Sequence, residues 1–176
     1  MKLYIARHTS VDVPHGTCYG QTDVALRDTF AEEAETVIQK LEGLSFDKVF
    51  TSPLSRCTKL AAFCGYENAV REKRIMEINF GEWEMKPFES ITDPRIREWF
   101  NDFIHVRTTG GESFMDLYNR VTDFLNELKQ EPYDNVLLFA HGGILVCAQI
   151  YTGMTEMSKA FESVPPYGSV VEFDIY

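Results

Sequence analysis

Short apolar runs recur along the chain and alternate with longer segments in which apolar residues return every three or four positions. Residues 2–7, 46–52 and 135–140 are compact apolar runs rich in strand-forming residues. Runs of this length and composition predict buried strands. Residues 169–176 alternate apolar with polar side chains, which predicts an edge strand with one face in solvent. We also expect a strand within residues 69–76.

Helical spacing is found between these strands, where apolar side chains fall on one face of a 3.6-residue repeat. Asp28 or Thr29 is a candidate cap for the first helix. Ser52 and Pro53 suit the N-cap and first position of the second helix. The segments predicted to be helices are residues 29–42, 54–64, 95–103 and 113–130, and the stretch that follows Gly143.

Alternation of strands and helices predicts an α/β protein: a three-layer α/β/α sandwich around one mostly parallel sheet. The length of 176 residues favours a single domain over residues 1–176. Residues 84–111 are irregular and predict a small helical insert. In folds of this class, ligands bind beyond the carboxyl ends of the strands. We therefore expect the functional site at those ends.

Reactive or cationic side chains follow three of the predicted strands. Arg7 and His8 end the first strand, Arg56 lies in the turn after the second, and His141 follows residues 135–140. Arginine offers a planar fork of donors that matches phosphate oxygens. Histidine can act as a nucleophile when its imidazole is neutral, and a neighbouring guanidinium disfavours protonation. These residues predict a site for phosphoryl chemistry.

Composition narrows the possible partners. The net charge of −10 is a poor match for nucleic acid or for an anionic membrane. No run approaches the ~20 apolar residues of a membrane helix, and the N-terminus does not resemble a signal peptide. The four cysteines are not spaced as metal ligands, so we expect free thiols. We therefore expect a cytoplasmic protein with a small-molecule partner, and we leave a homodimer open.

Five motifs in order resemble those of the histidine phosphatase superfamily, which has the phosphoglycerate-mutase-like fold. They extend from residue 7 to residue 143 and so cover most of the chain. The first departs from the usual Arg-His-Gly, because Thr9 stands at its third position. The motifs are Arg7-His8-Thr9, Ser52-Pro53-Leu54-Ser55-Arg56, Glu77 to Glu84, Gly111-Glu112-Ser113 with Arg120, and Ala140-His141-Gly142-Gly143.

The resemblance implies a role for each matching residue. His8 would be the nucleophile that forms a phosphohistidine, and Arg7, Arg56 and His141 would hold the phosphoryl oxygens. Glu77 would protonate the leaving alcohol and later take a proton from water. Glu82 stays open as the alternative acid, and Glu84 is expected at the solvated surface. No metal and no cofactor are implied.

Residues 16–26 resemble the corresponding loop of the α-ribazole phosphatase branch, which acts in the assembly of the cobalamin nucleotide loop. Pro14 stands where phosphoglycerate mutases have asparagine, which is a departure from that branch. Substrate contacts are expected from the backbone amides of Gln21 and Thr22 and from Gly142. Gly142 and Gly143, the two glycines that follow His141, allow a close backbone approach to a ligand. The alternatives are a broad-specificity or sugar-phosphate phosphatase, a phosphoglycerate mutase, and a phosphate-binding module without turnover.

Two histidines and an aromatic group have no assigned role. His15 lies in the loop after the first strand, and its contact with substrate is left open; His105 falls in the insert. Trp99, Phe100 and Phe103 could form an apolar wall for an aromatic base. The competing interpretation is that they form the core of a small helical cap.

Overall fold

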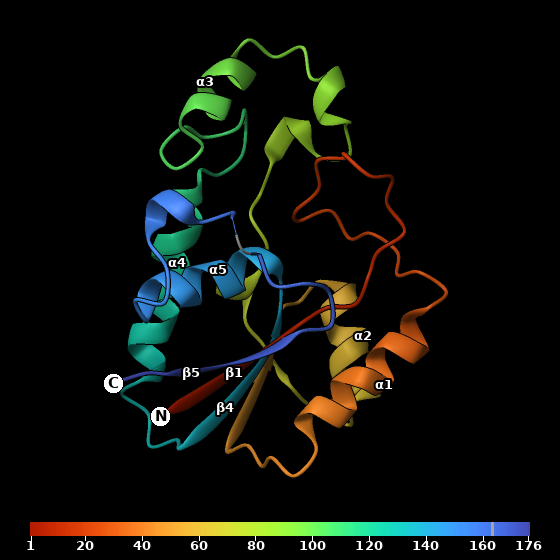
Figure 1. Cartoon of the computed structure of the whole chain (residues 1–176), viewed down its shortest axis with the longest axis vertical. Helices are drawn as coiled ribbons and strands as arrows, with labels where there is room; N and C mark the ends of the chain where they lie inside the picture. Colours follow the sequence, from red (N-terminus) through yellow and green to blue (C-terminus); the bar gives the residue numbers. More distant parts are fainter. Residues whose placement is uncertain (163) are drawn as a thin grey trace.

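The computed structural model describes residues 1–162 and 164–176 and contains a five-stranded sheet with helices on both faces (Figure 1). The strand order is β3-β2-β4-β1-β5, and β5 alone runs antiparallel to its neighbour. The predicted three-layer, mostly parallel α/β fold is therefore confirmed. The strands are β1 (Lys2–Arg7), β2 (Lys48–Thr51), β3 (Val70–Arg71), β4 (Asn135–Ala140) and β5 (Val170–Asp174).

Helices α1 (Phe30–Leu41) and α2 (Ser55–Phe63) cover one face, and α4 (Phe114–Leu128) and α5 (Gly142–Tyr151) cover the other (Figure 1). Each pair buries its own apolar cluster against the sheet. Burial of apolar surface on both faces is the main stabilising contribution in such a fold. Strands β1 and β4 are central and almost wholly buried, as their uninterrupted apolar sequences predict.

The insert of residues 84–111, between β3 and β4, lies at the end of the molecule farthest from the two termini (Figure 1). It contains α3 (Arg95–Asn101) and the 3₁₀ turn Phe88–Ser90. Two further 3₁₀ turns, Lys73–Ile75 and Gly81–Trp83, precede it, and one more, Met157–Lys159, follows α5. The predicted helix of residues 95–103 is two residues shorter in the structure.

Two local predictions need correction. The strand expected within residues 69–76 is limited to Val70–Arg71, because the chain turns into a 3₁₀ helix at Lys73. The second helix begins at Ser55 with Leu54 as its N-cap, so Ser52 and Pro53 do not have the capping positions assigned to them. The Ser52 hydroxyl instead faces His141, with 2.8 Å between Ser52 Oγ and His141 Nε2.

Candidate active site

The parallel pairing of β1 with β4 brings the two histidines together. Arg7 is in register with Ala140, and the His8 N–H donates to the Ala140 carbonyl oxygen at 3.0 Å. The next residues, His8 and His141, therefore leave the sheet side by side, with ring centroids 5.2 Å apart. Two residues more than 130 positions apart in sequence thus meet at the carboxyl edge, where ligands of α/β folds bind.

The environment of His8 keeps one ring nitrogen unprotonated. Its side chain is 2% exposed, and Nδ1 lies 2.8 Å from the Thr9 carbonyl oxygen. A carbonyl oxygen only accepts, so Nδ1 carries the proton and Nε2 keeps its lone pair. Burial, followed by the charges of Arg56 and Arg7, lowers the pKa of His8 to about 3. The imidazole is therefore neutral at pH 7. Burial lowers the pKa of His8 more than the neighbouring guanidinium groups do, although the sequence pointed to a guanidinium as the cause.

Arg56 is fully buried, although it lies in the first turn of α2. Its guanidinium donates to the carbonyl oxygens of Gly20 and, at 3.0 Å, Thr22. Its Nε is buried without a hydrogen-bond partner among the described residues. A buried, incompletely paired arginine is costly for stability, so its position favours a role in holding an anion.

Arg7 is held by the segment that precedes β5, whereas Arg56 is held by the loop that follows β1. One of its terminal nitrogens donates to the Pro165 carbonyl oxygen at 2.5 Å, and its Cζ lies 4.1 Å from the centre of the Tyr167 ring. Such cation–π contacts orient a guanidinium without neutralising its charge. Like Arg56, Arg7 has a buried Nε without a partner in the part of the chain that the structure describes.

His141 is fully buried at the start of α5 and lies between Ser52 and His8. Burial, then the charge of Arg56, lowers the pKa of His141 well below its ordinary value. The ring is therefore neutral at pH 7 in this structure. A bound dianionic phosphate would favour its protonation, which would add a positive charge next to the phosphate.

Glu77 is placed by α5. Its two carboxylate oxygens accept N–H groups of Ile78 at 3.0 Å and of Gly143 at 3.1 Å. A β-carbon at position 143 would overlap Glu77 Oε1, and one at Gly142 would lie 3.1 Å from Arg7 Cζ. The two glycines, expected to make room for a ligand, thus make room for Glu77 and Arg7.

Arg120 fixes the backbone that carries Glu77. Its guanidinium donates to the carbonyl oxygens of Arg74 at 2.6 Å, Met76 at 2.7 Å and Glu77 at 2.9 Å, and it pairs with Glu112 at 2.8 Å. All donor directions of the planar fork are used. The motif that contains Glu112 and Arg120 therefore positions Glu77, and neither residue lines the cavity that contains His8 and Glu77.

The loop after β1 is organised by Glu84. Its carboxylate accepts the N–H groups of Gly20, Gln21 and Phe80, and the Thr22 hydroxyl at 2.8 Å. The expectation that Glu84 is a solvated surface residue is therefore wrong. The Gln21 amide, expected to bind phosphate, already donates to Glu84 at 2.9 Å, and the Gln21 side chain donates to the Glu77 carbonyl oxygen at 3.1 Å. Both contacts give Gln21 a positioning role.

Arg7, His8 and Glu77 line a cavity of about 250 Å³, whereas Arg56 and His141 are fully buried and are not among its lining residues. Glu82, the alternative acid, lines a different cavity with Trp83 and Asp93. His15 and His105 are exposed and do not line the cavity that contains His8; His105 pairs with Asp102 at 3.0 Å. The cavity is lined by Arg7, His8, Tyr19, Glu77, Ile78, Phe80, Leu117, Gly142, Gly143, Phe161, Val164 and Tyr167.

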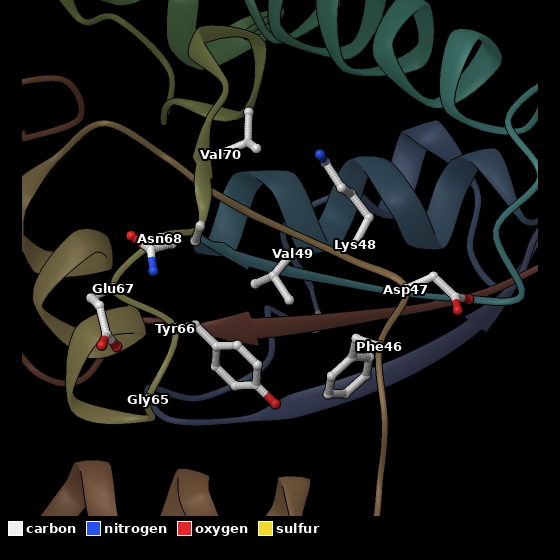
Figure 2. Close-up of a pocket in the computed structure, with 10 residues that line it drawn as sticks. Phe46, Asp47, Lys48, Val49, Gly65, Tyr66, Glu67, Asn68 and Val70 are labelled. Carbon is white, nitrogen blue, oxygen red and sulfur yellow. The ribbon is translucent and has the colours of Figure 1, made fainter.

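Another hollow, of about 280 Å³, lies near the amino-terminal ends of β2 and β3 (Figure 2). The rings of Phe46 and Tyr66 lie on one side of β2, and the Lys48 side chain extends to the other side. Because β2 and β3 are parallel to β4, this hollow lies at the end of the sheet opposite the histidines. It has no nucleophile paired with a cationic group, so it is a poor candidate for the site.

The loop before β5 also contributes to the site, which the sequence patterns did not predict. Tyr167 lies 5.5 Å from the His8 ring, centre to centre, and its hydroxyl is 2.8 Å from the hydroxyl of Tyr19. The two tyrosines thereby connect the loop after β1 to the loop before β5 across the site. Only the turn residues Pro165-Pro166 and Gly168 around Tyr167 mark this segment in the sequence, and turn composition alone does not indicate a site.

Among the described residues, three or more His, Cys, Asp or Glu side chains do not gather in any group that could hold a metal ion. The four cysteines form no disulfide there. In the same residues we find no helix with the length and apolar character needed to cross a bilayer.

Comparison with known proteins gives one family match over residues 3–176, to the histidine phosphatase superfamily (branch 1). An adenosylcobalamin/α-ribazole phosphatase of Escherichia coli is 29% identical over 82% of this chain and 75% of its own length. Phosphoserine phosphatase 1 of Hydrogenobacter thermophilus is 30% identical over 78% and 69%. The crystal structure of an α-ribazole phosphatase from Shigella flexneri superposes with a TM-score of 0.90 at 24% identity, covering 100% of this chain and 91% of that one.

Proposed function

Because the chain belongs to the histidine phosphatase superfamily (branch 1), we propose that it hydrolyses a phosphate monoester through a phosphohistidine on His8. The observation that carries this proposal is the neutral His8 imidazole, with a free Nε2, beside Arg7, Arg56 and His141. Glu77 lines the same cavity and is the carboxyl group available there.

In the first step, His8 Nε2 attacks phosphorus, the N–P bond forms, and the bond from phosphorus to the leaving oxygen breaks. Protonated Glu77 gives its proton to that oxygen, so the alcohol leaves neutral. Arg7 and Arg56 stabilise negative charge on the non-bridging oxygens throughout, because their guanidinium groups are already oriented. Preorganised charge of this kind needs no rearrangement during the reaction.

In the second step, water attacks phosphorus and Glu77 accepts its proton. The N–P bond breaks, inorganic phosphate is formed, and His8 Nε2 recovers its lone pair. Glu77 begins and ends the cycle as an acid, so the two steps balance. Rapid-quench experiments under alkaline conditions, which preserve phosphohistidine, should trap label from a ³²P-ester on the wild type. The His8→Ala variant should trap none.

We further propose α-ribazole phosphate as the substrate, which would place the reaction in the assembly of the cobalamin nucleotide loop. The relatives from Escherichia coli and Shigella flexneri support this choice. The test is phosphate release from α-ribazole phosphate, ribose 5-phosphate, phosphoserine and 3-phosphoglycerate, compared by kcat/KM. We expect the highest value for α-ribazole phosphate. A higher value for phosphoserine, or isomerisation of 3-phosphoglycerate faster than phosphate release, would overturn it.

A further inference from the structure

A second cavity, of about 450 Å³, opens next to the one that contains His8. Ile78, Phe80 and Phe161 line both cavities, so the two are neighbours. Volumes of this size are in the range of small-molecule sites. The lining of the second cavity is entirely apolar: Ile78, Phe80, Phe88, Trp99, Phe100, Phe103, Phe114 and Phe161.

The aromatic rings of this cavity are not simply the core of the insert. Phe80, Phe88 and Trp99 pack against the buried core of the insert, which is the cluster of Cys18, Trp83 and Ile91, whereas Phe100 and Phe161 are not among the residues packed there. Phe100 is 60% exposed and Phe161 is 47% exposed, although each contacts other rings of the cavity. Large aromatic side chains that stay exposed together, around a hollow, are typical of a binding surface.

The rings are arranged to accept a flat group. Phe88 and Trp99 are stacked, with centroids 5.8 Å apart and 20° between their planes. Phe100 and Phe103 meet Trp99 at steeper angles, so ring faces and edges both border the hollow. Planar aromatic ligands bind through such offset and edge-to-face contacts.

The position of Glu77 links the two cavities. It is the group proposed to protonate the leaving oxygen, and the next residue, Ile78, lines both hollows. An alcohol that departs past Glu77 thus enters an apolar space with no charged side chain in its lining. Charged leaving groups such as serine or glycerate would lose hydration there without gaining a partner.

We propose that this aromatic cavity binds an uncharged, planar aromatic group carried by the leaving alcohol and thereby selects the substrate. The proposal rests on the proposed function, since it places the phosphate of the same ester at His8. It assigns the insert, through Phe88, Trp99, Phe100 and Phe103, a part in substrate recognition.

The test compares two esters that differ only by the aromatic base, α-ribazole 5′-phosphate and ribose 5-phosphate. In the wild type, kcat/KM should favour the first ester by about tenfold or more, because base–aromatic stacking is of that strength. Phe100→Ala and Phe161→Ala should each reduce this ratio at least fivefold. Both side chains are exposed, so their truncation leaves the fold intact. Phe63→Ala is the matched control, since Phe63 is 41% exposed and lies in α2.

A wild-type ratio near one overturns the proposal, and so does a ratio that is unchanged in both variants or reduced equally by Phe63→Ala. If neither ester is hydrolysed, the proposed function fails, and the cavity is then tested by binding alone. Unphosphorylated α-ribazole should quench tryptophan fluorescence, and the quench should be lost in Trp99→Phe and weakened in Phe100→Ala. Absence of any quench overturns the aromatic cavity as a binding site.

Discussion

Glu77 and Gly143 are fitted to one another: the Gly143 N–H donates to Glu77 Oε2 at 3.1 Å, and Glu77 Oε1 occupies the place of a missing β-carbon. Gly143→Ala should therefore displace the carboxyl group and lower kcat about a hundredfold, as small misplacements of catalytic groups do. In a Glu77→Gln background the same substitution should cost little more, because the two act on one group. Additive losses in kcat/KM would contradict this coupling.

The leaving-group dependence tests the role of Glu77. Glu77→Gln should slow an alkyl phosphate at least a hundredfold and p-nitrophenyl phosphate far less, since nitrophenolate leaves without a proton. Glu82→Gln is the control and should keep the wild-type rates, because Glu82 lines another cavity. Equal slowing of both esters by Glu77→Gln, with a loss in Glu82→Gln, would transfer the acid role to Glu82.

Removal of the nucleophile should separate binding from turnover. His8→Ala should abolish hydrolysis while Arg7 and Arg56 still bind an anion, so vanadate should bind with reduced affinity in calorimetry. His105→Ala, a change at an exposed position, should hydrolyse esters and bind vanadate like the wild type. Retention of turnover by His8→Ala would exclude the phosphohistidine.

Stability should depend on pH through His8. Its pKa is about 3 in the folded protein, against an ordinary 6.5. Between these values the unfolded chain binds a proton that the folded chain does not, so stability falls as pH drops below 6.5. At pH 5 this lowers the free energy of unfolding by about 2 kcal/mol.

Urea unfolding at pH 7 and pH 5 checks this. Between the two pH values, His8→Gln should lose about 2 kcal/mol less than the wild type. His15→Gln, at an exposed loop position, should lose as much as the wild type. An identical loss in His8→Gln and wild type would mean that His8 does not titrate as its environment indicates.

The Arg120 clamp should matter for both stability and activity. Arg120→Met leaves three carbonyl oxygens and Glu112 without their donor, which should lower the free energy of unfolding by about 2–4 kcal/mol. It should also reduce kcat more than it raises KM, because Glu77 loses its position. Arg107→Met breaks an exposed pair with Asp116 and should change both quantities much less. Loss of stability without loss of kcat would contradict the positioning role.

Sequence patterns predicted the strands that carry the site more accurately than they predicted its details. Residues 135–140 and His141 were identifiable because a fully buried central strand has an uninterrupted apolar sequence. Glu84 was misassigned because its carboxylate accepts from four donors that come from separate segments. Sequence spacing does not reveal such convergence. Tyr167 was missed for the same reason, since its contact with Arg7 depends on how β5 pairs with β1.

That pairing has a consequence for synthesis on the ribosome. The first strand carries Arg7 and leads into His8, yet both strands that flank it, β4 and β5, lie within residues 135–174. During synthesis, His8 therefore lacks these neighbouring strands until residues 135–174 have been added to the growing chain. Premature termination before Pro165 would yield fragments that lack the Tyr167 and Pro165 contacts to Arg7. The site around His8 can thus form only after β5 has been added to the growing chain.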